Sequence, residues 1–294
     1  MSLSFAKGTI FLCSSGVGIV GNIFSFLTYM HMFNGTKKKY IHILFIHLAF
    51  TNSIMLLLKV IPKTLASFGV ENFLEDVDCM IFIYLERVTR GLSICTTCLL
   101  TLVQAITISP RDSVWRKLKL QSARHILCPL LFLWILNSLI SMNLLYHIKT
   151  ISHMNTSQIT QNDSYCYFLP GNLIMRWIFL ALMVLRDAVF QGIMSVASGY
   201  IVFLLCKHHQ HVLYLKGSKF LYKTSPEMKA AHSVLLLMLC FLFFYWTECV
   251  LSLFIHSFLQ NSSMMVNIQE FLRVGYAILS PFILIPKDRN LAQC

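Results

Sequence analysis

Charged residues are scarce in this chain. Asp, Glu, Lys and Arg make up 12% of its 294 residues, whereas a soluble globular domain carries about 25%. Hydrophobic residues make up 56%, and the mean hydropathy is +0.68. So few charges do not cover the surface of a water-soluble domain of this length. The composition therefore predicts a polytopic protein of the lipid bilayer.

Acidic residues are scarcer than basic residues in this chain. The chain has 12 Asp and Glu against 24 Lys and Arg, which gives a net charge of +12. A basic balance raises the question of nucleic acid, but such binding needs a basic face and a groove-reading motif. Here the basic residues lie in short segments between apolar runs, and no such motif accompanies them. We therefore predict no nucleic-acid partner.

Soluble domains and inverted repeats are also missing. A helix needs about 20 mostly apolar residues to cross the hydrocarbon core. Such runs occur at about 8–31, 41–65, 79–108, 125–147, 173–206, 228–258 and 267–285. The pattern predicts an all-α membrane protein, a single bundle of seven transmembrane helices over residues 1–294. The absence of a repeat argues against a transporter made of two matching halves.

The basic residues are unevenly divided between the two sides of this predicted bundle. Fifteen lie after the first, third and fifth runs and in the tail: Lys37, Lys38, Lys39, Arg111, Arg116, Lys117, Lys119, Arg124, Lys207, Lys216, Lys219, Lys223, Lys229, Lys287 and Arg289. The opposite side has Lys7 and Lys149, and its first loop is acidic. Because positive loops stay in the cytoplasm, we predict an external N-terminus and a cytoplasmic C-terminus.

Glycosylation sequons agree with this orientation. Asn155 and Asn162 begin sequons in the second outer loop, and Asn261 begins one in the third. A sequon marks a surface loop on the external side. We predict glycosylation at these three positions.

Most of the ten cysteines lie inside the apolar runs. Cys95 and Cys98 form a C-x-x-C motif, but zinc needs four converging ligands, so we interpret them as small interior residues and predict no metal site. Cys79 opens the third run on the outer side, and Cys166 lies in the second outer loop. Disulfides persist on an oxidising face, so we predict a Cys79–Cys166 bridge.

Charges inside the apolar runs are the first candidates for a functional site, because such residues in a membrane face the bundle interior. The third run carries Glu86, Arg87 and Arg90, and the spacing of Glu86 and Arg90 allows them to pair. These charges are either a structural ion pair between helices or the polar floor of a ligand pocket, and both readings stay open.

Three later runs add charges at a similar depth. They carry Arg186-Asp187, Glu248 and Arg273. Opposite charges in lipid should neutralise one another. We predict that Asp187 pairs with an arginine of the third run and that Glu248 pairs with Arg273.

Aromatic and methionine side chains occupy the same outer halves. Each alone is more simply explained by lipid contact or core packing, but together with a few polar groups they fit a small, mostly apolar pocket. The predicted ligand-binding residues are Glu86, Arg87, Arg90, Met183, Asp187, Phe190, Tyr245, Glu248, Phe271 and Arg273. No cofactor is expected.

The arrangement resembles a rhodopsin-like G-protein-coupled receptor, and in detail the vomeronasal type-1 receptor family. The motifs that carry the resemblance are RVTRGLSIC at 87–95, QAITISPR at 104–111, Arg186-Asp187, Ser225-Pro226-Glu227 and Ser280-Pro281-Phe282. The usual acidic-Arg-Tyr triplet reads Val103-Gln104-Ala105, and Asn52 replaces the usual helix 2 aspartate. The vomeronasal type-1 receptors share these departures. Without that carboxylate we expect no bound sodium ion.

The resemblance implies a function. It implies a pheromone or odorant receptor of sensory neurons, in the cell membrane, that couples to a heterotrimeric G protein of the inhibitory class. The predicted G-protein contacts are Gln104, Ser109, Pro110, Arg111 and Lys223. A bitter-taste receptor is the alternative receptor reading, since that family also lacks the triplet. A seven-helix hydrolase or transporter is the remote alternative. We expect no enzyme activity, because the interior carboxylates lack the His partners of a metal site.

Overall fold

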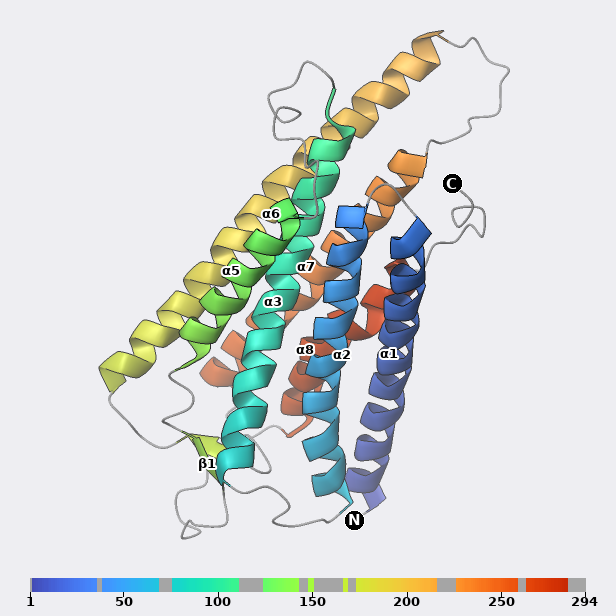
Figure 1. Cartoon of the computed structure of the whole chain (residues 1–294). Helices are drawn as coiled ribbons and strands as arrows, with labels where there is room; N and C mark the ends of the chain where they lie inside the picture. The colour runs from blue at the N-terminus through green and yellow to red at the C-terminus, as the bar shows by residue number, and fades with distance from the viewer. Residues whose placement is uncertain are drawn as a thin grey trace.

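The chain is almost entirely helical. The computed structural model describes residues 2–35, 39–68, 76–110, 124–142, 148–150, 166–168, 173–215, 226–258 and 263–284. Over these residues it forms the helices and strands α1 (Ser2–Gly35), α2 (Lys39–Ser67), α3 (Asp76–Ile108), α5 (Arg124–Ser141), β1 (Ile148–Thr150), β2 (Cys166–Phe168), α6 (Leu173–Leu215), α7 (Pro226–Phe258) and α8 (Ser263–Leu284). The helices pack side by side as an elongated bundle (Figure 1).

The lengths and surfaces of the helices suit a bilayer. Five stretches are long and apolar enough to cross it: Gly8–Phe33, Ile41–Leu65, Val77–Ile108, Trp177–Lys207 and His232–Leu251. Many large apolar side chains on these helices point outward, with exposed fractions between 39% and 74%. A water-soluble monomer rarely exposes so much contiguous apolar surface. The helices therefore form a bundle whose outer surface matches lipid.

A helix lies over each of the seven predicted runs. α5 covers the predicted run 125–147 as far as Ser141, and residues 143–147 lie outside the described ranges, so the end of that run stays a prediction. The predicted helix 173–206 continues to Leu215 in α6. The segment after 206 is polar but has no Gly or Pro before Gly217, so nothing in it stops the helix. In Figure 1 this end of α6 extends beyond the rest of the bundle.

α3 is the central helix. It has the largest buried share of the five spans, 72%, and it contacts α2, α5, α6 and α7. Its buried polar row satisfies its own hydroxyl groups, because Thr96, Thr97 and Thr101 each donate to the carbonyl oxygen four residues earlier, at 2.7–2.9 Å. Such back-bonding gives each hydroxyl an acceptor within its own helix.

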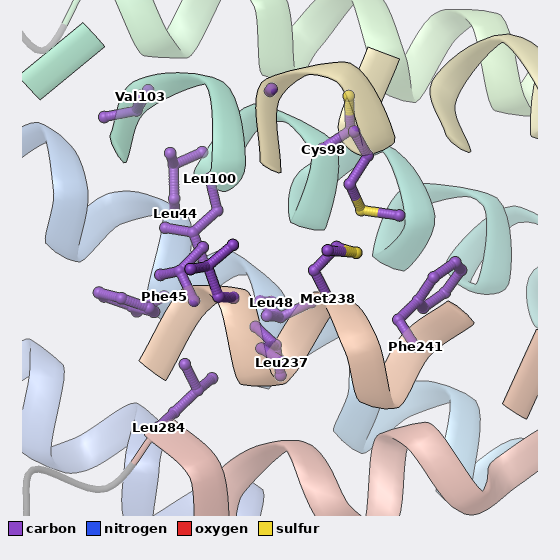
Figure 2. Packing of buried hydrophobic residues seen from close by; sticks show 14 of the residues in the cluster. Leu44, Phe45, Leu48, Cys98, Leu100, Val103, Leu237, Met238, Phe241 and Leu284 are labelled. Carbon is purple, nitrogen blue, oxygen red and sulfur yellow. The ribbon is translucent and has the colours of Figure 1, made fainter. Parts of the chain in front are cut away.

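The main apolar core lies between α2, α3, α6, α7 and α8. Leu44 and Leu48 of α2, Leu100 of α3 and Leu237 of α7 are fully buried there. Figure 2 shows these side chains pointing toward one another. The core fixes the half of the bundle in which α3 ends, and the polar cluster described below lies toward the half in which α3 begins.

A short hairpin caps the end of the bundle at which α1 and α3 begin (Figure 1). β1 and β2 pair antiparallel, with Thr150 opposite Cys166, and β1 packs against α3. The sequence analysis did not predict these strands. Cys79, at the start of α3, is buried and disulfide-bonded. The side chain of Cys166 is outside the described residues, so its pairing with Cys79 stays a prediction.

Candidate functional site

A small cavity lies where α2, α3, α7 and α8 meet. Its volume is about 30 Å³, and its lining residues are Met55, Arg90, Ser93, Ile94, Phe241, Phe244, Tyr245, Glu248, Leu272, Arg273 and Tyr276. A water molecule needs roughly 10–15 Å³ of such space, so this cavity has room for one or two. Its apolar wall and few charged groups are the usual features of a ligand site.

Glu248 of α7 is the junction of the charged groups at this cavity. Arg90 of α3 binds both of its carboxylate oxygens, with Nη1 at 3.1 Å from Oε1 and Nη2 close to Oε2. Arg273 of α8 donates from Nε to Oε1 at 3.0 Å. The predicted Glu248–Arg273 pair is therefore confirmed, and Arg90 is a second partner that the sequence analysis did not assign. One carboxylate thus joins three helices.

The predicted pairing of Asp187 with an arginine of α3 was wrong. Asp187 accepts from Nε of its own neighbour Arg186 at 2.8 Å and from the hydroxyl of Tyr245 at 3.3 Å. Arg186 also donates from Nη1 to Oδ1 of Asn137 at 2.8 Å. This guanidinium reaches α5 because Gly91 has no side chain: a Cβ there would lie 2.4 Å from Nη1 of Arg186.

Glu86 does not pair with Arg90 either. Its carboxylate lies 3.1 Å from Nζ of Lys59 on α2, and Arg90 turns toward α7 instead. A second lysine of α2, Lys63, pairs with Glu270 of α8. Neither lysine was among the predicted site residues, although a charge inside the apolar run 41–65 was a signal that could have identified them.

The remaining predicted ligand residues lie around the cavity rather than on its lining. Arg87 donates from Nη1 to Sδ of Met183 at 3.6 Å, which joins α3 to α6. Phe190 packs against the apolar core on α6. Phe271 is 43% exposed and faces outward from α8. Of the ten predicted ligand residues, Arg90, Tyr245, Glu248 and Arg273 line the cavity.

Next to the cavity, an amide takes the place of the carboxylate that the sequence lacks. Asn52 of α2 accepts from the Ser93 hydroxyl at 2.7 Å and donates to the Ser280 hydroxyl at 2.9 Å. Its side chain is fully buried. These two bonds connect α2, α3 and α8 through neutral groups.

His47 provides a further polar link that the sequence analysis did not single out. Trp134 donates from Nε1 to its Nε2 at 2.9 Å, and Nδ1 lies 3.0 Å from the Thr96 hydroxyl. An indole N–H only donates, and the Thr96 hydroxyl already donates to Leu92. The arrangement therefore requires a neutral imidazole with its proton on Nδ1, and it ties α2 to α3 and α5.

The predicted G-protein contacts are only partly within the described residues. Gln104 and Ser109 are buried, and the Ser109 hydroxyl lies 3.2 Å from that of Tyr200 on α6. Pro110 is exposed. Arg111 and Lys223 lie outside the described residues, as do the predicted glycosylation positions Asn155, Asn162 and Asn261.

The bundle of long apolar helices defines a helical membrane protein with a small cavity in its interior. Comparison with known proteins gives the family. The model of the vomeronasal organ pheromone receptor family matches residues 5–294. Human vomeronasal type-1 receptor 3 is 32% identical, with 99% of this chain and 94% of that protein covered.

Rodent relatives give the same result. Vomeronasal type-1 receptor 51 of Mus musculus is 32% identical over 97% of this chain and 89% of its own length. Vomeronasal type-1 receptor 100 of Rattus norvegicus is 31% identical over 96% and 86%. The chain belongs to the family of vomeronasal type-1 receptors, which are multi-pass membrane receptors and not enzymes.

Proposed function

We propose that this chain is a chemosensory receptor that binds a small, mostly apolar ligand in the outer half of its bundle and activates a G protein of the inhibitory class. The cavity between α2, α3, α7 and α8 is the observation that supports this ligand site. Apolar side chains form most of its wall, and Arg90, Glu248 and Arg273 supply charged groups on one side. A ligand with an apolar body and one or two polar groups fits this division.

The orientation that we propose places the N-terminus outside the cell. The disulfide-bonded Cys79 lies at the end of α3 that packs against the hairpin. Disulfides persist in an oxidising compartment. The bias of basic residues toward the opposite side supports the same direction. The cavity then lies closer to the external surface than the buried Ser109 at the end of α3.

Coupling would occur at the inner ends of α3 and α6. Pro110 is exposed at the end of α3, and Arg111 directly follows it. The side chains of Gln104 and Ser109 are buried in the bundle, so a G protein could not touch them in this conformation. We therefore assign them to the support of the inner end rather than to direct contact.

A ligand panel tests this proposal. Cells expressing the chain with a promiscuous G protein are exposed to steroids and volatile compounds, and intracellular calcium is recorded. At least one compound should give a saturable response that is absent from cells with the empty vector. With the native G proteins, pertussis toxin should then abolish the response, because it blocks the inhibitory class. A response that survives the toxin would contradict the G-protein assignment.

A further inference from the structure

Four ion pairs connect the same four helices that enclose the cavity. Lys63 of α2 pairs with Glu270 of α8. The other pairs join α2 to α3, α3 to α7 and α7 to α8. Taken in order, the four pairs connect α2, α3, α7 and α8 in a closed ring. We call this set the ion-pair circuit; its members are Lys59, Lys63, Glu86, Arg90, Glu248, Glu270 and Arg273.

The circuit depends on one face of each helix. α2, α3 and α8 each contribute two members, at separations of four, four and three residues. Residues at these separations lie one above the other on a helix. A rotation of any one of these helices would therefore disturb two pairs together. The four contacts thus constrain the helices as a group.

α2 supplies only cations to the circuit. Lys59 and Lys63 are four residues apart, and like charges at this separation destabilise a helix. Their side chains are 10% and 19% exposed, so water screens them little. The carboxylates that offset this repulsion come from α3 and α8. The position of α2 beside the cavity is therefore tied to both neighbours.

The circuit has more cations than carboxylates. It contains two lysines and two arginines against three glutamates. Loss of one lysine leaves equal numbers of each sign, whereas loss of one glutamate leaves four cations and two carboxylates. The two losses therefore leave different balances of charge within the circuit.

The cavity is too small for a drug-sized ligand. Its volume of about 30 Å³ holds one or two water molecules. A larger ligand enters only if the four helices move apart, and the circuit resists that movement. Arg90, Glu248 and Arg273 belong to both the circuit and the cavity lining, whereas Lys63 and Glu270 belong to the circuit alone.

We propose that the ion-pair circuit is a latch that sets the resting width of the ligand cavity. Opening it at any pair, including the remote Lys63–Glu270 pair, widens the cavity. This inference rests on the proposed function for its biological meaning, but the width of the cavity is measurable without a ligand or a G protein.

The test measures how fast a thiol in the cavity reacts. Leu272 lines the cavity, so Leu272→Cys is labelled on intact cells with a membrane-impermeant thiol reagent. The unsubstituted chain measures the background from native cysteines, and an epitope tag at the N-terminus normalises each rate to receptor at the surface. The rate is then compared in three backgrounds: Glu270→Gln, Lys63→Gln and the exchanged pair Lys63→Glu with Glu270→Lys.

If the circuit is a latch, breaking a pair should raise the labelling rate and restoring the pair should lower it again. Glu270→Gln should raise the labelling rate about fivefold or more, the range of coupling between linked sites. Lys63→Gln should also raise it, because it breaks the same pair, and the exchanged pair should restore a rate within about twofold of the parent. An unchanged rate in Glu270→Gln, or no recovery in the exchanged pair, would overturn the proposal.

A second variant keeps the test decisive if Glu270→Gln does not reach the surface. Glu86→Gln removes a carboxylate on the other side of the circuit, where it pairs with Lys59 and does not line the cavity. It should give the same rise in labelling. No rise in this variant would also overturn the proposal. The labelling test needs no ligand, so a ligand panel without any response would contradict the proposed function and leave the latch to be decided by the labelling rates.

Discussion

Gly91→Ala tests the packing that lets the Arg186 guanidinium pass over Gly91 of α3 to reach Asn137 of α5. A Cβ at Gly91 would lie 2.0 Å from Oδ1 of Asn137 and 2.4 Å from Nη1 of Arg186. Both partners would have to move, and the 2.8 Å bond between them would break. Asn137 is fully buried and Arg186 is 7% exposed, so water does not replace the lost bond.

The expected cost has two parts. Forcing an extra methyl group into a packed interior costs about 1–3 kcal/mol, and loss of a hydrogen bond to a charged group costs about 1.5–3 kcal/mol. Because the two effects share the same atoms, we expect a total of about 2–5 kcal/mol. For a chain of 294 residues, such a loss corresponds to a fall of roughly 3–8 °C in Tm.

Thermal unfolding of the purified receptor in detergent measures this change. Gly192→Ala is the matched control, because α6 also places Gly192 in a helix but a Cβ there meets nothing within 4 Å. The control should match or slightly exceed the parent Tm, since Ala favours helix over Gly. Equal Tm values for Gly91→Ala and Gly192→Ala would refute the role assigned to Gly91.

Two further substitutions test the neutral polar links. Asn52→Ala removes the partner shared by the Ser93 and Ser280 hydroxyls and should lower stability by about 1–3 kcal/mol; an unchanged Tm would show that water replaces the amide. Trp134→Phe leaves Nε2 of His47 without its donor and should cost about 1–3 kcal/mol in the same assay, and no loss would contradict the bond.

The helices of this protein were predictable from the sequence. A run of about 20 apolar residues has few alternatives in a membrane protein, and a helix lies over each predicted run. The ends were less predictable. Polarity after Cys206 suggested an end to the helix, but no glycine or proline interrupts the chain before Gly217, and α6 continues.

The sequence indicated which charged residues lie at the site more reliably than which ion pairs they form. Glu248 and Arg273 could be paired because neighbouring helices place a carboxylate and a guanidinium at similar depths. The partner of Asp187 depended on the rotation of α6 and on the space beside Gly91. The rotation of α6 and the space beside Gly91 are set only when the helices pack, so a sequence pattern does not contain them.

The lysines of α2 show a different limit. Lys59 and Lys63 lie inside the apolar run 41–65, but the sequence does not show which carboxylates they meet. Their carboxylates lie on α3 and α8, which are separated from α2 by very different lengths of chain. Ion pairs between helices with such unequal separations form no local pattern, and only the assembled bundle brings them together.

The most direct test of the ligand site compares two adjacent phenylalanines of α7. Phe244 lines the cavity, whereas Phe243 is 64% exposed on the outer surface. For any compound that activates the receptor, Phe244→Leu should change its half-maximal concentration about tenfold or more, and Phe243→Leu should leave it within about twofold. Equal concentrations for both variants and the parent would contradict a ligand site in this cavity.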